Sequence, residues 1–211
     1  MSNSMSRSVD TVVWQDYRAS ETAMVVFYQT DPVSELPIRE VPEEYPSDIL
    51  PEPNYETATY GFYGCSRSKI RTAFMKSKIR YLIFVTKYAG TNQDYKDKFY
   101  ITGYIRVNKT ADVKKQHIRY CSDFSCLDEQ GCYALRGDEQ RFVSIEDAFE
   151  VTPEVLKSWD FKARLTRQAR IMLDEEKTRD VIDYLKEKED KTELYIEETA
   201  RLQPRNSEES E

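Results

Sequence analysis

Two stretches of the chain have the hydrophobic pattern of β-strands and lie close enough together to form a hairpin. Residues 81–88 (YLIFVTKY) are almost entirely apolar or aromatic, which is typical of a strand covered on both faces. Residues 99–107 (FYITGYIRV) alternate, which predicts one face with Phe99, Ile101, Gly103, Ile105 and Val107 and another with Tyr100, Thr102, Tyr104 and Arg106. Gly90 and Asn92 in the polar segment 89–98 favour an antiparallel hairpin.

Weaker patterns predict further elements on either side of this hairpin. Residues 23–28 are rich in β-formers and predict a short strand, and residues 132–136 and 141–145 predict two strands joined by a turn at Gly137 and Asp138. Residues 66–78 place Ile70, Ala73 and Phe74 at helical spacing, with Arg67, Arg71 and Lys78 on a neighbouring face. We therefore expect a short basic amphipathic helix just before the hairpin.

The C-terminal quarter of the chain has a helical composition. Thr152 followed by Pro153 and Glu154 is a helix start signal, because the threonine side chain can accept from a free backbone amide and proline needs no donor at the first helical position. Helical composition then continues through residues 152–203, and residues 204–211 form an acidic tail. We expect these helices to pack on, or extend from, a domain formed by residues 11–151.

Proline and charge mark the remaining boundaries. Six of the eight prolines lie between residues 32 and 53 and alternate with acidic residues, so residues 31–56 predict an extended acidic arm on the domain, or a disordered loop, rather than a helix or a central strand. Residues 1–10 are Ser-rich and predict a flexible tail without a signal peptide. With 211 residues, 39% of them hydrophobic and no apolar run near the roughly 20 residues that span a bilayer, we expect one cytoplasmic domain.

The net charge of −7 hides a strongly basic central segment. Residues 64–119 contain fourteen lysines and arginines against three aspartates, and tyrosines are interleaved with them. Cations neutralise phosphates and aromatic rings stack on unpaired bases, so this composition favours nucleic acid as the partner. The candidate contact residues are Arg67, Lys69, Arg71, Lys76, Lys78, Lys87, Tyr88, Tyr100, Tyr104 and Arg106. The equal alternative is an ordinary solvated surface whose cations pair with the protein's own carboxylates.

A possible zinc site follows the basic segment. His117, Cys121, Cys126 and Cys132 include the only histidine and three of the four cysteines, and Cys₃His is a known structural zinc set. Cys65 could replace one ligand. The alternative is that Cys132 packs inside a strand, that Cys121 and Cys126 are reduced thiols and that His117 lies on the surface.

Conventional catalysis is not favoured by the residues present. The chain has no Gly-rich phosphate loop, no H-E-x-x-H motif and no nucleophile elbow, and its one histidine belongs to the candidate zinc set. We therefore expect a binding protein rather than an enzyme.

The strand order of residues 60–151 resembles that of PUA-like modules, the superfamily that includes ASCH, EVE and YTH domains. The resemblance rests on YLIFVTKY, on FYITGYIRV with its Gly103-Tyr104-Ile105 turn, and on ALRGDEQRFVSIEDAFEV. It implies an α+β fold, with a small twisted antiparallel β-barrel, flanking helices and a C-terminal helical segment. It also implies binding of RNA or DNA, in some members by enclosing a modified base. Trp14 and Trp159 lie outside the matched stretch, so no cage residue is carried over.

Two functional hypotheses follow. The first is a nucleic-acid-binding module that reads an unpaired or modified base by stacking, and it requires the cations to form one continuous surface beside exposed tyrosines. The second is a zinc-stabilised interaction or regulatory subunit whose acidic C-terminal helices contact a protein partner. A related hypothesis is that the acidic arm competes with phosphate for the basic surface.

Overall fold

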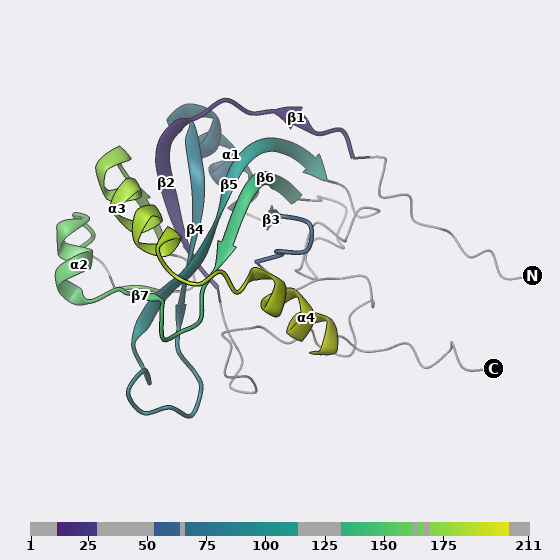
Figure 1. The fold of residues 1–211 in the computed structure, drawn as a ribbon. Coiled ribbons are helices and arrows are strands. Elements are labelled where there is room, and N and C mark those ends of the chain that lie inside the picture. The colour runs from purple at the N-terminus through teal and green to yellow at the C-terminus, as the bar shows by residue number, and fades with distance from the viewer. Residues whose placement is uncertain are drawn as a thin grey trace, which may run out of the picture.

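The protein folds around a curled, mixed β-sheet with helices on both faces (Figure 1). The computed structural model describes residues 12–28, 53–63, 66–113, 132–162, 164–166 and 169–202. Its elements, in chain order, are β1 (Gln15–Asp16), β2 (Ser20–Phe27), β3 (Thr59–Tyr63), α1 (Ser66–Ser77), β4 (Ile79–Lys87), β5 (Phe99–Val113), β6 (Cys132–Phe142), β7 (Phe149–Glu150), α2 (Pro153–Ser158), β8 (Arg170–Leu173), α3 (Glu175–Lys186) and α4 (Thr192–Leu202).

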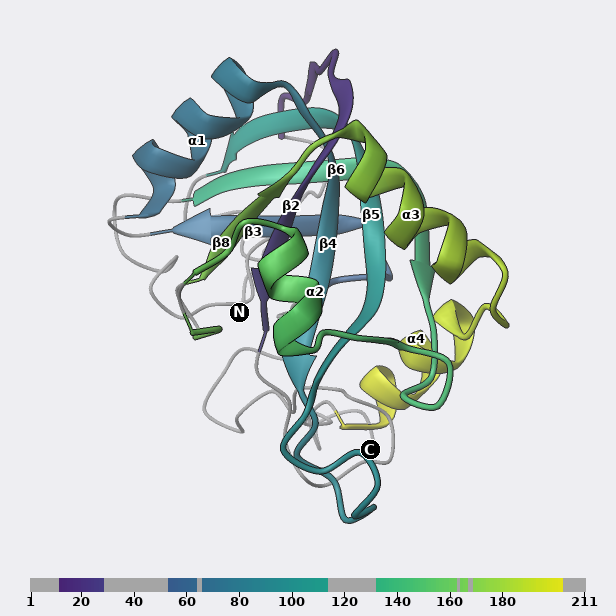
Figure 2. The ribbon, with the colours of Figure 1, turned by 90° about the vertical axis from the view of Figure 1, so that its left-hand side faces the viewer.

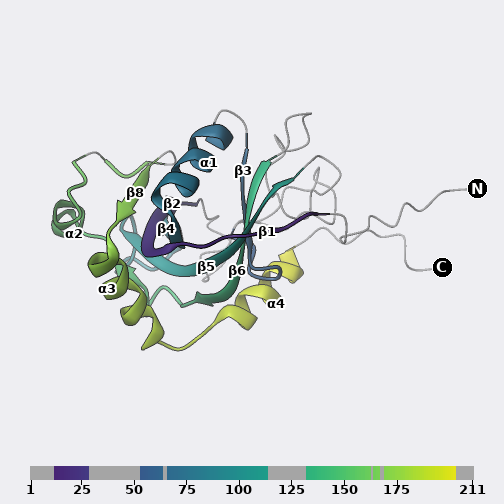
Figure 3. The same ribbon diagram turned by 90° about the horizontal axis from the view of Figure 1, so that it is seen from above.

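The sheet is open rather than closed, and it is not wholly antiparallel. Its strand order is β3-β6-β5-β4-β2-β8, with β1 and β7 both paired to β5, and Figure 3 shows it curling into half of a barrel. The expected α+β class is confirmed, but the expectation of an antiparallel sheet is wrong, because β2 and β4 pair in parallel. Parallel neighbours need a crossover, and the chain between them supplies one by passing through β3 and α1.

Two cores lie on opposite faces of the sheet. On one face α2, β8 and α3 contribute Trp159, Ile171 and Val181 to a cluster with the tyrosines of β4 and β5, and Figure 2 shows α2 and α3 in front of these strands. On the other face Phe74 of α1 and Tyr195 of α4 complete an aromatic-rich cluster. The central strands are therefore covered on both sides, as the composition of residues 81–88 predicts.

Several predicted elements are confirmed, although β5 continues to Val113, beyond its expected end at Val107. The β4–β5 hairpin is antiparallel, and α1 begins at residue 66 and buries Ile70 and Phe74. At the start of α2 the Thr152 side chain accepts a hydrogen bond from the Val155 amide at 3.3 Å, with Pro153 in the first turn.

Two predictions about strands are wrong. Residues 132–142 form the single strand β6 rather than a hairpin, because Gly137 lets the strand pass close to β5, where a side chain would overlap Ile105 and the Arg106 carbonyl oxygen. The segment expected to be helical contains β8, which pairs antiparallel with β2. Ile171 and Leu173 are buried while Met172 is exposed, so the period is two rather than 3.6.

Part of the predicted acidic arm belongs to the core. Tyr55 is 1% exposed and its ring makes edge contacts with Phe84, Phe142 and Tyr195. The rest of the arm, up to residue 52, lies outside the described residues, as do residues 1–10 and 204–211. The described end of the arm is thus an integral part of the domain.

The sheet is closely packed around Gly103. This residue lies within the 15-residue strand β5, opposite the register shift between Phe84 and Val85 of β4. A Cβ at Gly103 would overlap both the Arg141 carbonyl oxygen and the Tyr55 hydroxyl. Here glycine allows the backbone of β6 and the ring of Tyr55 to approach β5 together.

We expect Gly103→Ala to lower the free energy of unfolding by about 2 kcal/mol, because one methyl group overpacks a site whose nearest wall is backbone. For a chain of this length, that loss corresponds to a fall in Tm of about 6 °C. Calorimetry or urea denaturation measures it.

Tyr55→Phe is the matched control, because no described residue hydrogen-bonds the Tyr55 hydroxyl. This variant alone should be close to neutral, and the double variant should lose less stability than Gly103→Ala. A Gly103→Ala protein as stable as the parent would contradict the account.

Candidate nucleic-acid interface

The three tyrosines expected to stack on bases are core residues. Tyr88, Tyr100 and Tyr104 are 3%, 3% and 1% exposed, so the prediction that their rings are exposed is wrong. The reason is tertiary: the side of β5 that carries Tyr100 and Tyr104 faces the core completed by α2 and α3. Burial raises the pKa of Tyr100 to about 12 and that of Tyr104 further, so both phenols are neutral at physiological pH.

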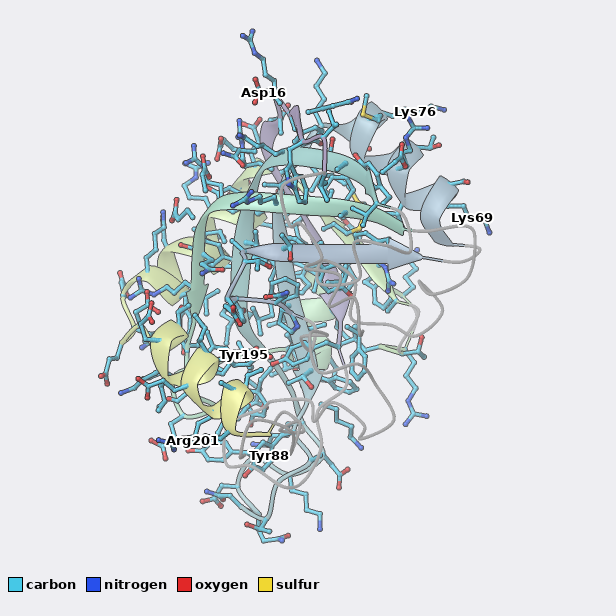
Figure 4. The ribbon with its side chains drawn as sticks, turned by 90° about the vertical axis from the view of Figure 1, so that its right-hand side faces the viewer. Asp16, Lys69, Lys76, Tyr88, Tyr195 and Arg201 are labelled. Carbon is cyan, nitrogen blue, oxygen red and sulfur yellow. The ribbon has the colours of Figure 1, made fainter. Side chains whose placement is uncertain are left out.

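The cations of the central strands are largely neutralised by the protein's own carboxylates. Lys87 pairs with Asp97 across the β4–β5 loop, and Arg106 lies 3.6 Å from Asp138 and 3.9 Å from Glu139. Figure 4 shows Lys69 and Lys76 at the opposite end of the molecule from Tyr88, which adjoins Lys87 in the chain. The prediction of one continuous positive surface is therefore wrong, because the basic segment runs the length of the sheet.

The α1 helix is the part of this segment that presents cations to solvent. It carries Arg67, Lys69, Arg71 and Lys76 and no acidic residue, and Lys78 follows directly after its last turn. Lys69, Lys76 and Lys78 are exposed and form no ion pair with any residue that the structure describes. The side chain of Arg67 lies outside the described residues. Of the predicted contact residues that the structure describes, those in and just after α1 therefore include exposed cations without an ion-pair partner.

One face of α1 borders a shallow hollow against the end of β5. Arg71 and Lys76 lie on its helical side, and Asp112 of β5 lies opposite. Arg71 Nη2 is 3.7 Å from Asp112 Oδ2, and both side chains are about half exposed. Asp112 was not among the residues predicted from the sequence, because the predicted strand ended at residue 107 and no local signal shows that β5 continues to α1.

A second hollow, of about 280 Å³, lies between α3 and the start of β2 and β4. Its lining mixes three carboxylates with two cations, among them Glu21 and Lys186, around Tyr81. Because carboxylates outnumber cations in its lining, this hollow does not favour a polyanion.

Beside this hollow, Glu139 of β6 is the centre of a polar network. It accepts from the Tyr104 hydroxyl at 2.7 Å and pairs with Lys186 at 2.8 Å. Burial raises the pKa of Glu139, but the hydrogen bonds from Lys186 and Tyr104, together with the positive charges of Lys186 and Arg106, outweigh it, so its pKa lies below the usual value. This network links β5, β6 and α3, which makes it structural rather than a phosphate site.

The predicted zinc ligands are not brought together in the described part of the chain. His117, Cys121 and Cys126 lie outside it, and Cys132 is the first residue of β6, with its side chain also outside it. The zinc site stays a prediction.

Comparisons with protein-family models, with curated proteins and with solved structures found no match to this chain. Among the residues that the structure describes, no helix has the length and apolar character to cross a membrane. The candidate interface therefore rests on the geometry and charge of α1 and its neighbours.

We expect Glu139→Gln to lower the free energy of unfolding at pH 7 by about 1 kcal/mol, a value reduced for the partial exposure of the site. The lowered pKa means that the carboxylate stabilises the fold above the pKa of the unfolded chain and that this stability is lost as the pH falls through the folded pKa. The difference between the parent and the variant, measured by urea denaturation, should therefore shrink below about pH 4.

Asp138→Asn serves as the control, because Asp138 is more exposed and Arg106, with which it pairs, is 3.6 Å away. Its effect should be smaller. A Glu139→Gln deficit that is constant from pH 7 to pH 3 would contradict the assigned role.

Proposed function

We propose that this protein binds nucleic acid through the phosphate backbone, with α1 as the contact surface. The observation that carries the proposal is a helix with four cations and no acid, whose Lys69 and Lys76, together with Lys78 just beyond it, are exposed and unpaired among the described residues. Clustered cations of this kind release counterions from phosphates, which is the main source of sequence-independent affinity.

The size of α1 suits contact with several phosphates. Its 12 residues extend about 18 Å. A duplex carries one negative charge per about 1.7 Å of its axis, or about ten charges over that length. The helix is held in place by Ile70 and Phe74, which are buried, so the cations project from a rigid support. Contacts with two to four phosphates are within reach of such a surface.

We propose contact with the phosphate backbone only, without recognition of individual bases. With Tyr88, Tyr100 and Tyr104 buried, we expect similar affinity for unrelated sequences and for modified and unmodified bases. The strand pattern of residues 60–151 resembles PUA-like modules, and a PUA-like relationship, with the nucleic-acid binding it implies, is part of the proposal. A zinc-stabilised partner-binding role depends on residues 117–132 and stays a separate hypothesis.

We expect Lys69→Glu/Lys76→Glu to weaken binding to a 20-base-pair duplex at least tenfold at low salt. The plot of log affinity against log salt should also become shallower by about 2, because two phosphate contacts are lost. Fluorescence anisotropy at several salt concentrations measures both quantities.

The matched control is Lys157→Glu/Lys162→Glu, which changes the net charge equally at exposed positions in and after α2, the helix that packs on the other face of the sheet. Its affinity should stay within about threefold of the parent at physiological salt, where charges farther apart than a Debye length are screened. Equal losses in both variants would show a net-charge effect and contradict the assignment to α1. Salt-independent binding, or none, would overturn the proposed function.

Lys78→Gly separates binding from folding. Lys78 has φ of 50°, a left-handed conformation that costs a lysine more than a glycine, and it directly follows α1. We expect the variant to gain roughly 0.5 kcal/mol of stability while its duplex affinity falls a few-fold through loss of one cation. Thermal denaturation and anisotropy give the two results.

Asp160→Gly is the companion control, because Asp160 has φ of 56° at the end of α2 and lies away from α1. It should also gain stability but leave affinity unchanged. If Lys78→Gly bound as tightly as the parent, Lys78 would have no place in the interface.

A further inference from the structure

The hollow beside α1 is lined by donors from one face of the helix. Ser68, Arg71, Thr72, Met75 and Lys76 have the spacing i, i+3, i+4, i+7 and i+8, so they form a single stripe. All five are exposed. Two cationic groups and two hydroxyl groups therefore face the same shallow hollow.

These donors match the chemistry of a phosphodiester. Each diester carries one negative charge and two terminal oxygens that accept hydrogen bonds, and hydroxyls, ammonium groups and guanidinium groups are its usual donors in proteins. The planar guanidinium of Arg71 can donate two parallel hydrogen bonds to such a group. The hollow can thus hold one phosphate against the helix.

A carboxylate already lies at this position. Asp112 closes the hollow from β5, and its Oδ2 is 3.7 Å from Arg71 Nη2, which is longer than a hydrogen bond. With 58% and 46% of the two side chains exposed, the pair is solvated and exchangeable. A phosphate that approached Arg71 would meet the negative charge of Asp112 beside it.

We propose that the hollow between α1 and β5 is a binding site for one backbone phosphate. Arg71, Lys76 and the hydroxyls of Ser68 and Thr72 hold the phosphate, and Asp112 competes with it for Arg71. This inference rests on the proposed function. It adds the position of one phosphate contact and a reason why the affinity for the duplex is limited. Asp112 acts as an internal anion, so the parent protein binds the duplex more weakly than its cations alone would allow.

The test is Asp112→Asn, which keeps the shape of the side chain and removes its charge. We expect it to tighten binding to the 20-base-pair duplex about three- to tenfold at low salt, with a steeper salt dependence and convergence with the parent at high salt. Asp112→Ser should give the same result, so that a fold defect in one variant cannot hide the effect.

Two controls separate local competition from general charge. Asp97→Asn removes a more exposed negative charge, one that pairs with Lys87 in the β4–β5 loop, and it should leave affinity unchanged. In an Arg71→Gln background the gain from Asp112→Asn should be smaller, because the competition is for the arginine. If Asp112→Asn tightened duplex binding equally with and without Arg71, or if Asp97→Asn tightened it as much, the proposed phosphate site would be wrong.

The outcomes also separate this inference from the function on which it rests. Suppose that the parent binds the duplex and that Lys69→Glu/Lys76→Glu weakens this binding, but that Asp112→Asn and Asp112→Ser bind no tighter. The proposed phosphate site is then wrong, while the proposal of backbone binding through α1 stands. If the parent does not bind the duplex at any salt concentration, both proposals fall.

Discussion

The central strands β4 and β5 carry apolar or aromatic side chains on both faces, and the rest of the structure follows from the need to cover them. Leu82, Ile83 and Phe84 are three consecutive residues of β4, and all are fully buried although they alternate between faces. A strand of this kind is stable only with a layer on each side, because each exposed side chain would forgo roughly 1.5–3 kcal/mol of burial. The C-terminal segment supplies one layer through α2 and α3, and α1 with α4 supplies the other.

Because both faces of the sheet are covered, the tyrosine side chains of its central strands are buried and cannot stack on a ligand. The tyrosines that could have formed a stacking platform fill the core beneath α2 and α3, where Tyr104 also ties β5 to Glu139. Among the residues that the structure describes, α1 combines a buried face, with Ile70 and Phe74, and exposed cations without an acid of its own. If the protein binds nucleic acid as proposed, such a helix would contact phosphates rather than read bases.

The protein's own carboxylates limit how strongly its exposed cations can bind an anion. The chain has a net charge of −7, and acids from distant elements reach Arg80, Lys98 and Arg106. Positive potential survives where α1 has no acid of its own, and even there Asp112 reaches Arg71. Binding of nucleic acid by such a protein would be a competition between phosphate and internal carboxylates, and hence sensitive to salt and to single acidic residues.

Elements with strong local signals could be predicted from the residues alone, because hydrophobic period, turn residues and caps act over a few residues. They are the β4–β5 hairpin, the basic amphipathic helix α1 and the Thr152 cap of α2, and the basic segment with Lys69 and Lys76 was also located in this way. Tertiary packing was needed to show that β2 and β4 pair in parallel, that β8 is a strand, that the tyrosines are buried and that Asp112 lies beside Arg71. Those outcomes depend on which distant segments cover each face and which carboxylates reach each cation, and alternation along a single strand shows that its faces differ without showing what lies against them.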